Sequence, residues 1–142
     1  MSMRRPVLFA AALLLITACE DRNNPFGSGI SNNDRTPPTV VSTVPGSLAT
    51  QVGLSAPITV TFSEQMATSS ITAAAFTFSP TVAGTLSYAG NTATFTPTTP
   101  LVANTSYTVT VSTAVEDRAG NNLVAPHAWT FTTGPTFAGV AP

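Results

Sequence analysis

The stretch GTLSYAGNTATF (84–95) decides the fold class of this chain. Apolar and polar residues alternate on both sides of its central Gly-Asn pair, a pattern typical of two strands joined by a two-residue turn. With this turn Tyr88 pairs with Ala93 and Leu86 pairs with Phe95, so all four side chains share one face. A register shift of one residue would scatter them over both faces. The stretch therefore predicts a hairpin with one buried face.

The same period of two recurs along the chain. It is clearest in ITVTF (58–62), YTVTV (107–111) and WTFT (129–132), where apolar residues alternate with Thr. The segment AFTFS (75–79) predicts a shorter strand, and Val41 and Val44 are assigned to a first one. Pro and Gly separate these segments, and only 67–75 is compatible with a helical turn. About seven short strands without a long amphipathic helix predict an all-β fold, a β-sandwich.

Charge and cysteine content exclude several classes of protein. The 142 residues include five Arg or Lys and six Asp or Glu, and all five basic residues are Arg. No basic cluster lies beyond the first five positions, so we expect no nucleic-acid partner. With one Cys and one His, the chain can form neither an internal disulfide nor a zinc site of Cys and His.

The first nineteen residues, MSMRRPVLFAAALLLITAC, have the order of a secretory signal: positive charge, a short apolar core and small residues. The apolar run 7–18 would make about 18 Å of helix, too short for a bilayer core of about 30 Å. Its end, ITAC (16–19), resembles the bacterial lipoprotein signal. The resemblance implies cleavage after Ala18 and attachment of acyl chains, such as palmitate, to Cys19. The alternative is a plain membrane anchor with a chance cysteine.

The composition changes again after the leader. Residues 1–18 are interpreted as the signal peptide, and 19–36, rich in Asn, Asp, Ser and Gly, as the lipidated Cys and a flexible tether. The folded domain is expected over 37–134, and 135–142 form a short tail. We expect a protein of the bacterial cell envelope, held through lipid on Cys19 at the outer membrane or the cell surface.

Four motifs in order resemble the bacterial Ig-like domain of the S-layer (SbsA) type. They are PPTVVSTVPGSLATQVGLSAPITVTFSEQM (37–66), ANTSYTVTV (103–111), EDRAGNNL (116–123) and AWTFTTG (128–134). The resemblance implies an Ig-like β-sandwich that serves as a non-catalytic module of exported or surface proteins. The sequence departs from the family in having Ala67 where an Asp is frequent, and in carrying one copy of a domain that often repeats.

No set of residues predicts catalysis. His127 stands alone at the start of a strand, without a nucleophile-elbow motif, and Glu64 is isolated. The loop EDRAGNN is a weak candidate for calcium, because Glu116, Asp117, Asn121 and Asn122 offer oxygen ligands. Asp, Gly and Asn are also the residues of a tight turn, and we favour this interpretation. No other cofactor is expected. Glu64 is expected to cap a turn or to protect an edge strand.

The aromatic residues allow two interpretations. Trp129, with Tyr88 and Tyr107, can be a platform for sugar stacking or part of the core, and its alternation with Thr favours the core. Tyr107 also resembles the tyrosine corner of Ig-like sandwiches. We expect a non-catalytic envelope lipoprotein with a structural, spacing or adhesion role. Its partners are then the membrane and an envelope protein or polysaccharide. The alternatives are a carbohydrate- or calcium-binding accessory module, or a fragment of a larger exported multidomain protein.

Overall fold

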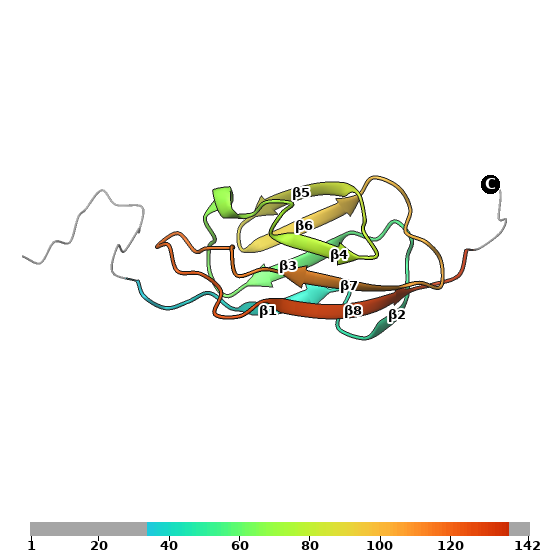
Figure 1. The fold of residues 1–142 in the computed structure, drawn as a ribbon, viewed down its shortest axis with the longest axis horizontal. Helices are drawn as coiled ribbons and strands as arrows, with labels where there is room; N and C mark the ends of the chain where they lie inside the picture. The colour runs from blue at the N-terminus through green and yellow to red at the C-terminus, as the bar shows by residue number, and fades with distance from the viewer. Residues whose placement is uncertain (1–33, 137–142) are drawn as a thin grey trace, which may run out of the picture.

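Two four-stranded sheets pack face to face in the computed structural model, which describes residues 34–136 (Figure 1). One sheet has the order β1-β3-β6-β5 and the other β2-β8-β7-β4. The strands are β1 (Val40–Val44), β2 (Ala49–Val52), β3 (Ile58–Phe62), β4 (Phe76–Ser79), β5 (Gly84–Ala89), β6 (Thr92–Pro97), β7 (Ser106–Val111) and β8 (His127–Thr133). A single 3-10 turn, η1 (Thr68–Ser70), lies in the segment expected to be helical. The predicted all-β sandwich is confirmed.

The hairpin of β5 and β6 has the predicted register. Tyr88 pairs with Ala93 and Leu86 with Phe95. Gly90 has a φ of 59°, the left-handed conformation that glycine adopts without steric cost. The turn and the alternation therefore specify the same pairing, and this is why the register could be predicted from a single sequence.

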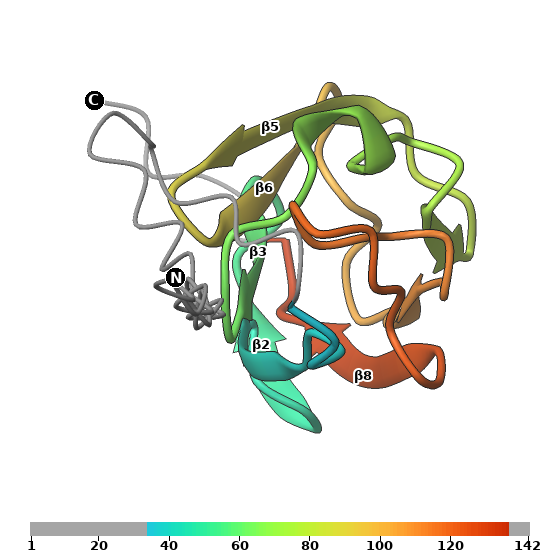
Figure 2. The ribbon, with the colours of Figure 1, turned by 90° about the vertical axis from the view of Figure 1, so that its left-hand side faces the viewer.

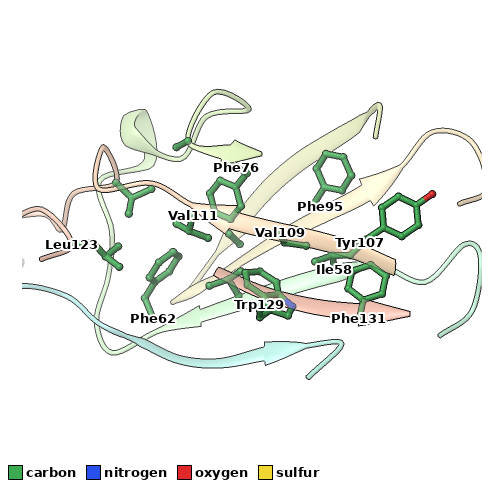
Figure 3. Close-up of a cluster of buried hydrophobic side chains, with 14 of the residues drawn as sticks. Ile58, Phe62, Phe76, Phe95, Tyr107, Val109, Val111, Leu123, Trp129 and Phe131 are labelled. Atoms are coloured by element: carbon green, nitrogen blue, oxygen red, sulfur yellow. The ribbon is translucent and has the colours of Figure 1, made fainter. Parts of the chain in front are cut away.

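The core lies between the sheets and consists of the apolar residues of each strand (Figure 3). Val109, Val111 and Phe131 are at most 1% exposed, and Trp129 is 3% exposed. The rings of Tyr107 and Phe131 stack with centroids 5.7 Å apart. Burying each large apolar side chain is worth about 1.5–3 kcal/mol, so these alternating residues account for the sandwich.

The outer faces of both sheets carry Thr and Ser. None of the eight strands contains Asp, Glu, Lys or Arg. Neighbouring hydroxyls meet across strands, as between Thr61 and Thr92, whose Oγ1 atoms are 3.1 Å apart. The branched Thr side chain suits the pleat and its hydroxyl meets water, which keeps these faces polar without charge.

The first segment of the domain crosses from one sheet to the other. β1 pairs antiparallel with β3, whereas β2 pairs parallel with β8. Leu48 and Gln51 have φ angles of 62° and 56°, which interrupt the alternation, and β2 was not predicted for this reason. Val41 and Val44 belong to β1 as predicted, but both are exposed.

The two ends of the described chain lie at opposite ends of the long axis of the molecule (Figure 1). Residues 34–39 lead into β1 at one end, and the chain leaves β8 at the other. Within 34–136, no helix is long and apolar enough to cross a membrane.

Candidate functional site

The charged residues of the domain gather at one end of the sandwich, which we call the charged end. Figure 2 faces this end, where the segment before β1 meets the loops after β3 and β7. Between residues 34 and 136, the charged side chains are those of Asp34, Arg35, Glu64, Glu116, Asp117 and Arg118. Because no strand carries a charge, this end is where electrostatic chemistry is possible in the described part of the chain.

Asp117 is the centre of the charged end. It is 1% exposed, and its Oδ1 accepts hydrogen bonds from the backbone N–H groups of Ala119 (2.7 Å) and Asn121 (2.9 Å). Its Oδ2 accepts a third from Asn121 Nδ2 at 2.7 Å. Burial alone would raise the pKa of Asp117, but the hydrogen bonds from Asn121, Ala119 and Gly120 outweigh it and hold the pKa below its ordinary value. Asp117 is therefore a buried, ionised anchor of its own loop.

Two more carboxylates approach Asp117 from other parts of the chain. Carboxylate oxygens of Asp34, Glu64 and Asp117 lie within 4.8 Å of one another, and we call these residues the acidic cluster. Asn121 Nδ2 also donates to the Asp34 carbonyl at 3.1 Å, which holds the segment before β1 against the loop. Partial burial, followed by the charges of Asp117 and Asp34, raises the pKa of Glu64. In the described residues, no hydrogen bond to the Glu64 carboxylate offsets this repulsion.

The four residues proposed from the sequence as calcium ligands separate into two pairs. Asp117 belongs to the acidic cluster, and Asn121 donates hydrogen bonds to Asp117 and to the Asp34 carbonyl. Glu116 and Asn122 interact with each other instead, through Asn122 Nδ2 and Glu116 Oε1 at 3.4 Å. The Asn122 amide also donates to the Thr113 carbonyl at 3.0 Å. The hydrogen bonds of this loop are those of a turn. Its one buried carboxylate, that of Asp117, lies close to Asp34 and Glu64, two acids outside the loop.

Sequence reasoning missed Asp34 and Glu64 as members of a site. The sequence predicts Asp34 in the tether, and Glu64 as a turn cap or as protection of an edge strand. One signal could have found them: in a domain with so few charges, acids precede β1, follow β3 and follow β7. β1 and β3 are antiparallel neighbours, so the start of one and the end of the other lie together. Three carboxylates so close together form a donor set suited to a hard divalent cation such as calcium, with water completing the six to eight ligands.

The loops of the charged end are tied to each other around this cluster. Ser70 Oγ accepts the Glu116 N–H at 3.0 Å, and the Ala67 N–H donates to the Glu116 carbonyl at 2.8 Å. Arg118 Nη1 donates to Gln65 Oε1 at 2.8 Å. The Tyr88 hydroxyl accepts the Met66 N–H at 2.7 Å. The loops after β3 and β7 therefore hold the acids of the cluster in fixed positions.

The opposite end, which we call the neutral end, is held by hydroxyl groups. The Val102 N–H donates to the Tyr107 hydroxyl at 3.0 Å, which confirms the predicted tyrosine corner. Thr133, 2% exposed, accepts the Thr105 N–H at 2.9 Å and donates to the Val102 carbonyl at 2.6 Å through its Oγ1. Two side chains from β7 and β8 thus fix the loop that precedes β7.

The remaining candidates occupy structural positions. Trp129 is in the core as predicted, so its indole has no open face on which a sugar could stack. The His127 ring packs near Trp129, with centroids 5.7 Å apart. Among residues 34–136, no hydrogen bond joins His127 to a hydroxyl or a carboxylate. Cys19, the predicted lipidation site, lies outside the described residues.

Comparison with known proteins agrees with this architecture. The bacterial Ig-like domain family matches residues 34–133. The chain belongs to this family. The four sequence motifs predicted a bacterial Ig-like domain, and this match confirms that prediction. No curated protein matches the chain.

Solved structures with this fold belong to longer proteins. An L,D-transpeptidase from Mycobacterium smegmatis is 22% identical over 70% of this chain and 41% of its own, with a TM-score of 0.53. An L,D-transpeptidase, LdtMt1, solved in complex with imipenem, is 20% identical over 70% and 41%, with a TM-score of 0.51. The N-terminal part of the bacterial S-layer protein SbsC is 25% identical over 70% and 24%, with a TM-score of 0.50. This chain therefore spans less than half the length of each.

Proposed function

We propose that this protein is a non-catalytic cell-envelope lipoprotein whose Ig-like domain acts as a spacing or adhesion module on the bacterial surface. Lipid on Cys19 holds it to a membrane, and residues 20–33 connect that anchor to the domain. The observation that carries the proposal is the placement of the two ends of the domain. The chain enters the sandwich at the charged end and leaves at the opposite end of the long axis (Figure 1).

This placement suits a spacer, because whatever lies before Asp34 and whatever lies after Thr136 are kept apart by the length of the strands. The strands carry no Asp, Glu, Lys or Arg, and within residues 34–136 no hydrogen bond joins His127, the first residue of β8, to a hydroxyl or a carboxylate that would make a catalytic pair. The S-layer protein SbsC, which shares the fold at 25% identity, supports a location at the cell surface. The apolar run ending in ITAC supports export and lipidation.

The anchor is tested by the variant Cys19→Ala, with Ser28→Ala in the neighbouring segment as the matched control. The parent and the control should partition into the detergent phase and yield an N-terminal peptide carrying acyl chains by mass spectrometry. Cys19→Ala should remain in the aqueous phase. Detergent partitioning of Cys19→Ala equal to that of the parent would show that another segment anchors the protein.

A second candidate function is calcium binding by the acidic cluster, which the approach of its three carboxylates favours. Partial burial, followed by the charges of Asp117 and Asp34, raises the pKa of Glu64, and a bound cation would offset the repulsion between these carboxylates. In this role the cation would fix the segment before β1 to the domain.

Thermal unfolding with calcium chloride or with EDTA tests this function. Calcium should raise the melting temperature of the parent and leave that of Glu64→Gln almost unchanged. Glu116→Gln, outside the cluster, should respond as the parent does. An equal response of all three proteins to calcium would exclude the acidic cluster as the site.

A further inference from the structure

A groove of about 450 Å³ lies between the edge strands β4 and β5, and we call it the β4–β5 groove. It is lined mainly by apolar groups, among them Ala73, Phe76, Phe78, Val82, Gly84 and Phe95. β4 is the last strand of one sheet and β5 the last strand of the other. The groove is therefore the open seam of the sandwich on this side.

Within residues 34–136, no backbone hydrogen bond is made to the outer edge of β4. The Ala75 carbonyl accepts the Ser112 N–H from the end of β7, so by the alternation of an antiparallel ladder Thr77 and Ser79 face β7. The N–H and C=O groups of Phe76 and Phe78 then point toward the open edge. An extended chain is the partner that such a row of donors and acceptors fits.

The edge of β5 is arranged in the same way. The Ala83 carbonyl accepts the Thr98 N–H, so Thr85 and Ser87 face β6 and the backbone groups of Gly84 and Leu86 face outward. Two free strand edges therefore border one apolar groove.

Aromatic rings form the floor of the groove. Phe78 and Phe95, from opposite sheets, have ring centroids 4.3 Å apart. Gly84 allows this contact, because a Cβ at this position would lie 2.3 Å from Phe95 Cζ. Phe78 is only half-buried, so apolar ring surface remains open to a side chain entering from the groove.

The opposite seam of the sandwich differs. There β1 carries a bulge between Val40 and Ser42, and β2 covers the C-terminal half of β8. A bulge and a covering strand are devices that protect an edge. Neither β4 nor β5 has a bulge in its pairing, and the lining of the groove contains no charged residue. A charged partner segment would lose hydration there without gaining an ion pair.

We propose that the β4–β5 groove binds an extended, uncharged segment of a partner protein. The segment adds as a strand to the free edge of β4 and places an apolar side chain against Phe78 and Phe95. This inference goes beyond the proposed function and depends neither on the lipid anchor nor on calcium, so it is tested separately from both.

The probe is the peptide acetyl-Thr-Val-Thr-Phe-Thr-Val-Thr-amide, titrated into the ¹⁵N-labelled full chain in detergent micelles. The amide signals of Phe76 and Phe78, and those of Gly84 and Leu86, should shift together and saturate. The same peptide with Pro in place of the two Thr residues that flank Phe keeps the aromatic ring but lacks the N–H groups of a strand, and it should not bind. A version with Lys in place of the outer Thr residues should bind at least about tenfold more weakly.

A matched pair of variants locates the binding site. Ala73 and Ala74 are neighbouring exposed residues, and only Ala73 lines the groove. Ala73→Glu should weaken binding of the probe at least about tenfold, whereas Ala74→Glu should bind as the parent does. Equal binding by both variants would overturn the assignment of the groove.

Two other results would also overturn the proposal. Equal binding of the Pro peptide would mean that the groove accepts an apolar group without strand addition. Dimerisation of the chain alone, with the same amide shifts in the absence of peptide, would identify a second copy as the occupant.

Discussion

At each end of the sandwich a buried polar side chain fixes a loop, but the two side chains differ in chemistry. Each end has one fully buried polar side chain that fixes a loop, Asp117 at the charged end and Thr133 at the neutral end. Asp117 uses an ionised carboxylate with three donors, whereas Thr133 uses a hydroxyl that accepts one hydrogen bond and donates another. The first depends on a charge that protons and cations can change, and the second does not.

This difference identifies the part of the domain whose stability depends on charged side chains. The neutral end, the strands and the β4–β5 groove contain no Asp, Glu, Lys or Arg. All Asp and Glu side chains of residues 34–136 lie at the charged end, next to the segment that leads into β1, so their titration affects this end.

Removing the charged anchor should have the largest effect. We expect Asp117→Ala to lower the free energy of unfolding by about 3 kcal/mol or more, because three donors around a buried carboxylate lose their acceptor. Chemical denaturation with and without calcium measures this. Glu116→Ala, at the adjacent half-buried acid, should cost less than about 1 kcal/mol. Similar losses for both variants would remove the distinction between the buried Asp117 and the half-buried Glu116.

Removing the hydroxyl anchor should cost less. Thr133→Val keeps the shape of the side chain but leaves the Thr105 N–H and the Val102 carbonyl without their partner. The expected loss is about 1–2 kcal/mol and should be the same at pH 5 and pH 8. Thr132→Val, on the outer face of the same strand, should remain within about 0.5 kcal/mol of the parent. A loss for Thr133→Val that changes with pH would contradict the comparison of the two ends.

The smallest effect is expected from titration of the charged end. Because the pKa of Glu64 is raised in the folded state, the fold takes up a proton more readily than the unfolded chain. In metal-free buffer, stability should therefore rise as the pH falls through this raised pKa toward the ordinary value of 4.5. The pKa of Asp117 is lowered, so its contribution is lost only below its ordinary value of 3.8. Melting temperatures should pass through a maximum in mild acid, and Glu64→Gln should abolish the rise. A rise that persists in Glu64→Gln would assign it to another group.

The sheets could be predicted from the sequence wherever local signals agree. The hairpin 84–95 has both a two-residue turn and strict alternation, and its register was predicted correctly. The core positions of Trp129 and Phe131 follow from alternation with Thr. β2 escaped prediction because its strand is short and pairs in parallel with a distant strand, and because Leu48 and Gln51 have positive φ angles.

The acidic cluster could not be assembled from the sequence because its members lie far apart in the chain. The sequence identified Asp117 as a carboxylate of the loop after β7. Asp34 and Glu64 come close to it only because the segment before β1 and the end of β3 lie side by side in the folded domain. The sequence offered Glu116 and Asn122 only as weak calcium candidates in the same loop, with a turn favoured, and the fold pairs these two side chains with each other. Local patterns predicted the strands, and contacts between loops determined the site.

The crossover of β1 and β2 has a mechanical consequence. Tension that pulls Asp34 and Thr136 apart runs along the strands, since the two lie at opposite ends of the molecule. β2 runs parallel to β8 and is bonded to it by Leu48 N–H to the Thr130 carbonyl (2.7 Å) and Gly134 N–H to the Val52 carbonyl (2.9 Å). These bonds lie across the direction of pull and are sheared together instead of being unzipped in turn. We therefore expect that stretching the domain along its length requires these bonds to break together.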